Sequence, residues 1–456
     1  MSPMQRIAVR NRISCIGVIT ANRPLALARC VGSFGQRLPI MVCDQFGKDK
    51  YRFAASLIAT GFSPDIVNFG LFGIDGAGQP IGANRNALLL HNTGEIAFYV
   101  DDDVVAHVFE HPEIAPGVAL VSSGNPSTIW FFPDFESARS AATFSEMDLI
   151  DAHERLIGRS VDDCVAEGLS DGPTPPPSQE LSNPSTYGTG KLVVTISGVV
   201  GDSGYGSNAA YLAVRGPSRA RLLESEKSYQ SALASRYVIR VPQTYAISDR
   251  TIAMAYGMAV DQRDIVPPFF PVGRNEDGVF GALVQIMYPP GAFGYVPYAV
   301  LHDPPEPRRA IPPWTTVGRF TTTGLTLALL NGIQIPAGSP GTRLRALGTL
   351  LVEMGSLEQR EFDAMAMGCL REALERRISR FESLIALFGG EPRFWADDCR
   401  RCVEAMESAS MNLDLDISLE MARMLIRSYG ELITVWQDML EAAKDLRRKG
   451  AGLIEC

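Results

Sequence analysis

Short apolar runs rich in β-branched and aromatic residues alternate with amphipathic stretches over the first hundred residues of the chain. The apolar runs predict strands at residues 13–20, 39–43, 66–69 and 96–100. The stretches between them predict helices at residues 24–34, 49–60 and 84–94. Strands and helices that alternate in this way are typical of an α/β protein, with a mostly parallel sheet and helices on both faces. In such sheets, ligands bind beyond the carboxyl ends of the strands.

The pattern changes twice further along the chain. Residues 171–190 are rich in Pro, Ser and Gly, which predicts an exposed, flexible insertion. From about Ser356 the pattern becomes helical, with Ser356 and Gln359 as a capping box. The expected helices lie at residues 357–388, 391–409 and 417–448. The predicted organisation is therefore an α/β domain over residues 1–340 and a C-terminal helical region over residues 356–450.

The last expected helix carries an apolar stripe. The stripe includes Leu425, Leu432, Trp436 and Leu440. An apolar face of this size has to be covered, either by the α/β domain or by a second copy of the chain. A homodimer through the C-terminal helices is therefore one of two expectations.

Three consecutive carboxylates close the strand expected at residues 96–100, in the sequence IAFYVDDDVVA. Asp101, Asp102 and Asp103 repel one another unless a cation lies nearby, and this repulsion raises carboxylate pKa values. One explanation is a solvated turn in which an Asp caps the next helix. The other is a divalent cation, because Mg²⁺ and Mn²⁺ prefer oxygen ligands and often share them with substrate phosphates. The run by itself leaves both explanations open.

Composition and charge narrow the classes of partner. The 456 residues include 42 Lys and Arg against 51 Asp and Glu, a net charge of −9, with no long basic block. Nucleic acid is therefore not an expected partner. No apolar run is long enough to span a bilayer, and the first residues lack the pattern of a secretory signal. A cytoplasmic location without a transmembrane segment is the prediction.

Several separated segments resemble, in order, the family-2-like glycosyltransferases of the GT-A fold, which transfer a sugar from a nucleoside diphosphate to an acceptor. The segment IGVITANRP is similar to the family's first strand and nucleotide-binding turn. This similarity implies that Thr20, Asn22 and Arg23 contact the donor. IMVCDQFGKD resembles the second strand and a DDGS-like element, with Asp44 toward the nucleotide base. The two residues after Asp44 depart from the usual pattern, so the identity of the base stays open.

Three further segments resemble the family's phosphate and metal motifs. GANRNALL is similar to its G-x-x-x-A-R-N-x-G segment, which implies that Arg85 lies toward the nucleotide. YVDDDVV resembles the D-x-D motif. By that resemblance, Asp103 binds a divalent metal, Mn²⁺ or Mg²⁺, and Asp101, with Asp102 beside it, binds the ribose or the sugar. YAVLHDPP places His302 where many GT-A enzymes have a histidine that completes the metal site.

The segment GRNEDGVFG resembles the family's E-D motif, with Asp277 as the expected catalytic base and Glu276 beside it. The resemblance as a whole implies an inverting, metal-dependent glycosyltransferase that takes a nucleotide sugar, with a UDP-sugar as the expected donor and an unknown acceptor. Each residue also has a structural alternative, such as a surface ion pair for Arg85 or a core position for His302.

Two other functions and one other motif remain as alternatives. The chain could be a non-catalytic nucleotide-sugar-binding or scaffold protein. It could also be a sugar-phosphate nucleotidyltransferase, although TANRP stands where such an enzyme carries a glycine-rich loop. The sequence GDSG at residues 201–204 copies the surroundings of a trypsin-like serine nucleophile, but the chain lacks that fold's context. A loop close to the donor sugar, or a structural turn, is the expectation there.

Overall fold

The computed structural model describes residues 11–121, 125–166, 190–249, 254–289, 292–411 and 413–451. Apart from Gly190, the insertion expected at residues 171–190 lies outside these described residues.

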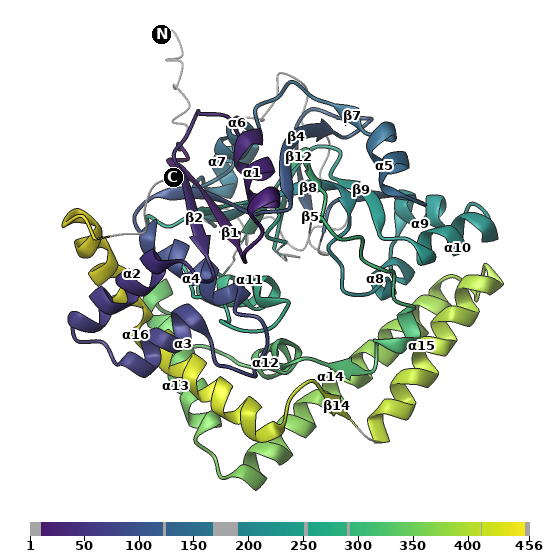
Figure 1. The fold of residues 1–456 in the computed structure, drawn as a ribbon. Helices are drawn as coiled ribbons and strands as arrows, with labels where there is room; N and C mark the ends of the chain where they lie inside the picture. Colours follow the sequence, from purple (N-terminus) through teal and green to yellow (C-terminus); the bar gives the residue numbers. More distant parts are fainter. Residues whose placement is uncertain are drawn as a thin grey trace, which may run out of the picture.

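A mixed β-sheet forms the centre of the α/β part (Figure 1). Within the described residues it has twelve strands, and eight of them lie side by side in the order β2 (Ile40–Asp44), β1 (Cys15–Thr20), β3 (Ile96–Asp101), β11 (Met258–Asp261), β8 (Leu192–Asp202), β12 (Ala292–His302), β10 (Tyr245–Ser248) and β5 (Val118–Val121). The pairs β1–β2, β1–β3, β8–β12 and β5–β10 are parallel, whereas β11 is antiparallel to both neighbours. The other strands are β4 (Val104–Glu110), which pairs with β12 and β7 (Thr143–Phe144), and β9 (Tyr237–Val241), which pairs with β8 and β6 (Thr128–Phe132).

Helices cover this sheet. In the α/β part they are α1 (Pro24–Ser33), α2 (Lys48–Ala59), α3 (Pro64–Phe72), α4 (Ile81–His91), α5 (Phe135–Ala141), α6 (Leu149–Glu154), α7 (Val161–Ala166), α8 (Ala209–Leu212), α9 (Gly216–Leu222), α10 (Glu226–Ala234), α11 (Glu276–Met287) and α12 (Thr322–Leu330). The expected α/β class is confirmed.

Helices cover both faces of the sheet, and strand β3 shows this, because successive side chains of a strand point to opposite faces. In β3, the ring of Phe98 packs against Phe34, which follows α1, and against His153 of α6. The next residue, Tyr99, points the other way and accepts a hydrogen bond from Asn92, which follows α4. Burial on both faces explains why the sequence of β3 is an unbroken apolar run up to Asp101.

The strand predicted at residues 66–69 is wrong, because this segment is the middle of α3. Pro64 occupies the first turn of the helix, a position that suits proline. The helix packs against α2, α4 and α16 and buries Val67 and Phe69, whereas Asn68 between them is exposed. A short apolar run looks alike in a buried strand and in a buried helix, so its periodicity could not separate the two.

A C-terminal helical region is present, as expected. Its helices are α13 (Pro340–Gly355), α14 (Gln359–Leu387), α15 (Arg393–Met411) and α16 (Leu419–Arg448). A short parallel pair, β13 (Arg319–Phe320) with β14 (Asp414–Leu415), joins this region to the segment before α12. The predicted capping box is wrong, because Ser356 ends α13 and Gln359 donates to Asp363 within α14 instead.

The apolar stripe of α16 is covered by the same chain. Leu425, Leu432 and Trp436 are fully buried, where α16 packs against α13 and against α2, α3 and α4. The indole Nε1 of Trp436 donates to the carbonyl of Val266 at 2.8 Å. The cover observed is the chain itself, through α13 and the α/β helices α2, α3 and α4, and a homodimer stays a prediction without this support.

The other end of the helical region lies against α8, α9 and α10, as Figure 1 shows. Trp395 of α15 is fully buried and its Nε1 donates to the carbonyl of Leu212 at 3.0 Å. Among the described residues, no helix combines the length and apolar composition that crossing a membrane requires.

Candidate functional site

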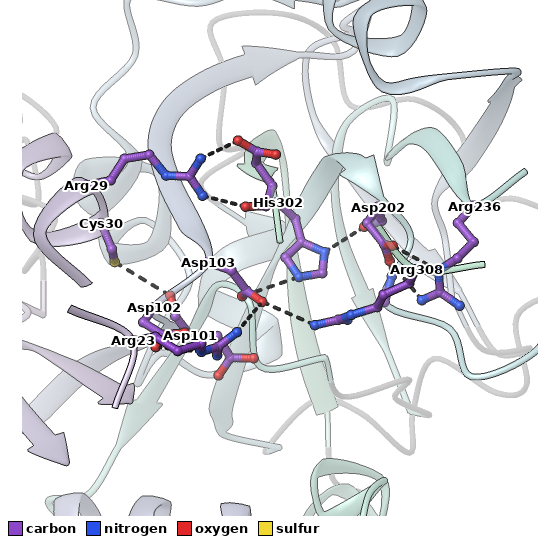
Figure 2. Close-up of polar contacts among 12 residues, drawn as sticks. Arg23, Arg29, Cys30, Asp101, Asp102, Asp103, Asp202, Arg236, His302 and Arg308 are labelled. Carbon is purple, nitrogen blue, oxygen red and sulfur yellow. Dashed lines mark hydrogen bonds and ion pairs between the residues drawn. The ribbon is translucent and has the colours of Figure 1, made fainter. Parts of the chain in front are cut away.

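The ends of β1, β2, β3 and β12 bring most of the predicted residues to one edge of the sheet. Thr20 is level with Asp44 on the neighbouring strand, and Ile19 is level with Asp101. His302 ends β12 opposite Val104, directly after the three carboxylates. Figure 2 shows the side chains of this edge converging.

Asp103 and His302 meet although they are far apart in sequence. Nε2 of His302 lies 3.4 Å from Oδ1 of Asp103, and both side chains are buried. Nδ1 of His302 donates a hydrogen bond to the carbonyl oxygen of Asp202 at 2.7 Å. That hydrogen bond points Nε2 toward Asp103. The predicted convergence of these two residues is therefore observed.

Positive charge keeps Asp103 ionised. Burial alone would raise its pKa, but His302, then Arg23 and Arg308, outweigh this effect and hold the pKa of Asp103 well below its usual range. Burial would likewise lower the pKa of His302, and the neighbouring Asp103 raises it instead. An ionised carboxylate thus stands beside an imidazole at the end of β12.

Asp102 holds Arg23 in place. Oδ2 of Asp102 accepts from the hydroxyl of Thr20 at 2.6 Å and from Nε of Arg23 at 3.0 Å. Oδ1 accepts from a second nitrogen of the same guanidinium. Asp102 is fully buried with both oxygens used, so in this arrangement it positions Arg23 and does not face a ligand. The exposed Asn22, at φ 54°, makes the left-handed turn between Thr20 and Arg23.

The donor atoms at Asp103 suit a divalent cation. Oδ1 of Asp103 is buried and has no hydrogen bond of ordinary geometry. Carboxylate oxygen is a ligand that Mn²⁺ accepts, and so is the imidazole nitrogen of His302 once Nε2 has released its proton. Within the described residues, no three His, Cys, Asp or Glu side chains form a complete metal site. Two protein ligands completed by phosphate and water are usual for Mg²⁺, so the residues present fit an ion shared with a substrate.

Arg85 connects the acidic run to the predicted catalytic pair. Its NH2 lies 2.7 Å from Oδ1 of Asp101, and its Nε lies 3.1 Å from Oε1 of Glu276. Arg85 is buried, with its guanidinium over the ring of Phe269. In this arrangement it joins two carboxylates, and contact with a nucleotide stays a prediction.

Asp277 lies in the first turn of α11, next to Glu276, and makes no ion pair with any described residue. Its Oδ1 accepts from the backbone N–H of Gly278 at 2.8 Å. Burial, and then the negative charge of Glu276, raise the pKa of Asp277 to about 7. A carboxylate with such a pKa can take a proton from a substrate near neutral pH.

Asp44 ends β2 at the same edge and is partly buried. Its Oδ1 accepts from the backbone N–H of Phe46 at 3.0 Å, so it closes its own turn. The base-contacting role of Asp44 stays a prediction.

Two supporting residues escaped the sequence patterns. The carbonyl oxygen of Asp202 accepts the hydrogen bond from His302. The carboxylate of Asp202 accepts from Nε and NH2 of Arg236, both at 2.9 Å. These residues orient the imidazole. Asp202 belongs to the GDSG sequence, whose Ser203 is fully buried and therefore no exposed nucleophile. Gly201 was the available signal, since a Cβ there would lie 2.4 Å from the carbonyl oxygen of His302.

The chain has no match among protein-family models or among curated proteins. A functional assignment therefore depends on the chemistry of this edge of the sheet.

Proposed function

We propose that the chain is a glycosyltransferase that moves a sugar from a nucleoside diphosphate to an acceptor, on an α/β core of the GT-A form. The observation that carries the proposal is the meeting of Asp103 and His302 from distant segments, with Asp277 placed beside Glu276, which Arg85 links to the same acidic run. One part of this edge is an ionised carboxylate beside an imidazole. The other is a carboxylate with a pKa near 7, connected to the first through Arg85 and Asp101.

Asp103 and His302 would hold Mn²⁺ or Mg²⁺ on the donor side. A bound ion would neutralise the negative charge that develops on the departing diphosphate. Arg23 lies 3.4 Å from Asp103 and is fixed by Asp102, so its guanidinium adds positive charge at the same place. A UDP-sugar is the proposed donor.

Asp277 would act on the acceptor side by taking the proton from the attacking hydroxyl. With a pKa of about 7, a large share of Asp277 is ionised at neutral pH while remaining a stronger base than an ordinary aspartate. Arg85 holds the adjacent Glu276 and so fixes the start of α11. A single displacement assisted by this base inverts the anomeric centre.

A thermal-shift screen with UDP-, GDP- and dTDP-sugars in the presence of Mn²⁺ tests the proposal. A ligand that binds the native state raises its apparent stability, and we expect the largest rise with a UDP-sugar. Asp103→Asn should abolish the Mn²⁺-dependent part of that rise. Release of UDP over time would separate an enzyme from a scaffold, which would be stabilised without turnover. No stabilisation by any nucleotide sugar would contradict the proposal.

A further inference from the structure

The carboxylate proposed to bind the metal already has two arginines on its other oxygen. Oδ2 of Asp103 lies 3.4 Å from NH1 of Arg23 and 3.3 Å from NH2 of Arg308 (Figure 2). A divalent ion on the same carboxylate would add two positive charges beside two guanidinium groups. Repulsion in a buried site is poorly screened by salt. An ion at Asp103 should therefore favour displacement of one of the arginines.

Arg23 is the arginine that cannot easily leave. It makes two hydrogen bonds with Asp102, whose side chain is fully buried. Removing Arg23 would leave a buried carboxylate without its cation, which is costly.

Arg308 is much less constrained. Among the described residues, Asp103 is the only group with which it forms a hydrogen bond or ion pair. It belongs to residues 303–312, which form no helix or strand and are largely exposed. The segment is held at its start, where the N–H of Asp303 donates to the carbonyl of Asp103 at 2.9 Å and Arg29 pairs with the carboxylate of Asp303. Beyond this anchor, the side chain of Arg308 can change partner without unfolding the site.

We propose that Arg308 competes with the divalent ion for Asp103. When the ion enters with a nucleoside diphosphate, the guanidinium of Arg308 leaves Asp103 and pairs with the phosphates. The inference rests on the proposed function. The planar guanidinium presents paired donors that match phosphate oxygens. The divalent ion then pairs with Asp103 and the guanidinium of Arg308 pairs with the phosphates, so that no buried charge is left unpaired.

The exchange couples the two ligands. An ion alone has to displace Arg308 from Asp103, whereas an ion that arrives with a diphosphate gives Arg308 a new partner. Metal should therefore bind weakly by itself and more tightly with the nucleotide, and the nucleotide should bind more tightly with Arg308 present.

Calorimetric titrations of Mn²⁺ and of UDP on the full chain test this exchange in Arg308→Gln. The neighbouring Arg309→Gln is a matched control, because it removes the same charge from an exposed residue that does not contact Asp103. In Arg308→Gln, Mn²⁺ without UDP should bind roughly tenfold more tightly, and UDP with Mn²⁺ roughly tenfold more weakly, within the usual range of coupling between sites. Arg309→Gln should change neither.

The outcomes separate this inference from the proposed function. Opposite shifts of the two affinities in Arg308→Gln support the exchange. Equal Mn²⁺ affinity in wild type and Arg308→Gln, or equal shifts in both arginine variants, overturns the exchange and leaves the metal site in place. If Mn²⁺ binds none of the proteins, with or without UDP, the metal site of the proposed function is wrong and the exchange falls with it.

Discussion

Two groups of carboxylates lie at the same edge of the sheet and have opposite charge balance. Around Asp103, Arg23, Arg308 and His302 supply positive charge, and the pKa of Asp103 is held low. Around Asp277, Arg85 is shared by Asp101 and Glu276. The pKa of Asp277 is raised to about 7 as a result of burial and of Glu276.

Nearby cations, and not burial, cause the different pKa values of Asp103 and Asp277. Burial acts in the same direction on both, because it disfavours the charged form. Asp103 stays ionised and suits a cation, whereas Asp277 exchanges a proton near neutral pH. Pairs of titratable groups whose surroundings push their pKa values apart are typical of sites that use one as a base.

The largest effect is expected on the rate of sugar transfer when Asp277 is replaced. Asp277→Asn should reduce the rate of sugar transfer by about 10²- to 10⁴-fold, the usual contribution of a general base. Asp65→Asn is a matched control, because Asp65 is also an acidic residue in the first turn of a helix but is exposed. Single-turnover rates with a saturating donor measure the effect. A native rate in Asp277→Asn would make Asp277 a structural carboxylate.

Removing the bridge between the two groups should destabilise the fold. Arg85→Met leaves Glu276 buried without its cation, and loss of one partner of a buried pair typically costs about 3–5 kcal/mol. The exposed pair of Arg29 and Asp303 offers a contrast, since Arg29→Met should cost less than about 1 kcal/mol. Denaturant unfolding of both variants gives the two values. Equal losses would show that the buried pair of Arg85 and Glu276 contributes no more to stability than an exposed ion pair.

The pH dependence of the rate should follow Asp277. Transfer requires the ionised base, so the rate should rise with pH and level off above about 7, the pKa of Asp277. In Asp277→Asn this rise should disappear from the residual activity. A profile of kcat from pH 5 to 9 in both proteins tests the assignment, and an unchanged rise in the variant would assign it to another group.

The smallest expected effect is on stability against pH. A raised carboxyl pKa contributes stability that is present below the ordinary pKa of aspartate and is lost as pH rises through about 7. Wild type should therefore lose stability relative to Asp277→Asn between pH 4 and pH 7, with a constant difference above. Melting temperatures over this range measure the change, and a pH-independent difference would contradict the raised pKa.

The parts of the fold that are local in sequence were predictable. Apolar runs predicted β1, β2 and β3, and the carboxylates at their ends indicated the candidate functional edge. Helix α3 was missed because a short, largely apolar run does not show by its periodicity whether it is a strand or a helix. The surface that covers α16 could not be predicted, because an apolar stripe indicates that a helix packs against a partner but does not identify the partner.

The supporting residues of the site could not be predicted, because long-range pairing creates them. Asp202 reaches His302 only because β8 and β12 run side by side. Arg308 belongs to no sequence motif, and only its ion pair with Asp103 in the folded chain identifies it. The carboxylates and Arg23, Arg85 and His302 were identified from motifs, whereas the contacts through which these cations set the carboxylate pKa values depend on the assembled fold.

Calorimetric binding of UDP, with and without Mn²⁺, to Asp103→Asn and Asp277→Asn tests the contrast between the two carboxylates most directly. We expect Asp103→Asn to lose the Mn²⁺-dependent part of the UDP affinity and Asp277→Asn to keep it, because a base acts chiefly in the transition state. Equal losses in both variants, or full Mn²⁺-dependent affinity in Asp103→Asn, would contradict the division of the site into a cation-binding and a proton-accepting carboxylate.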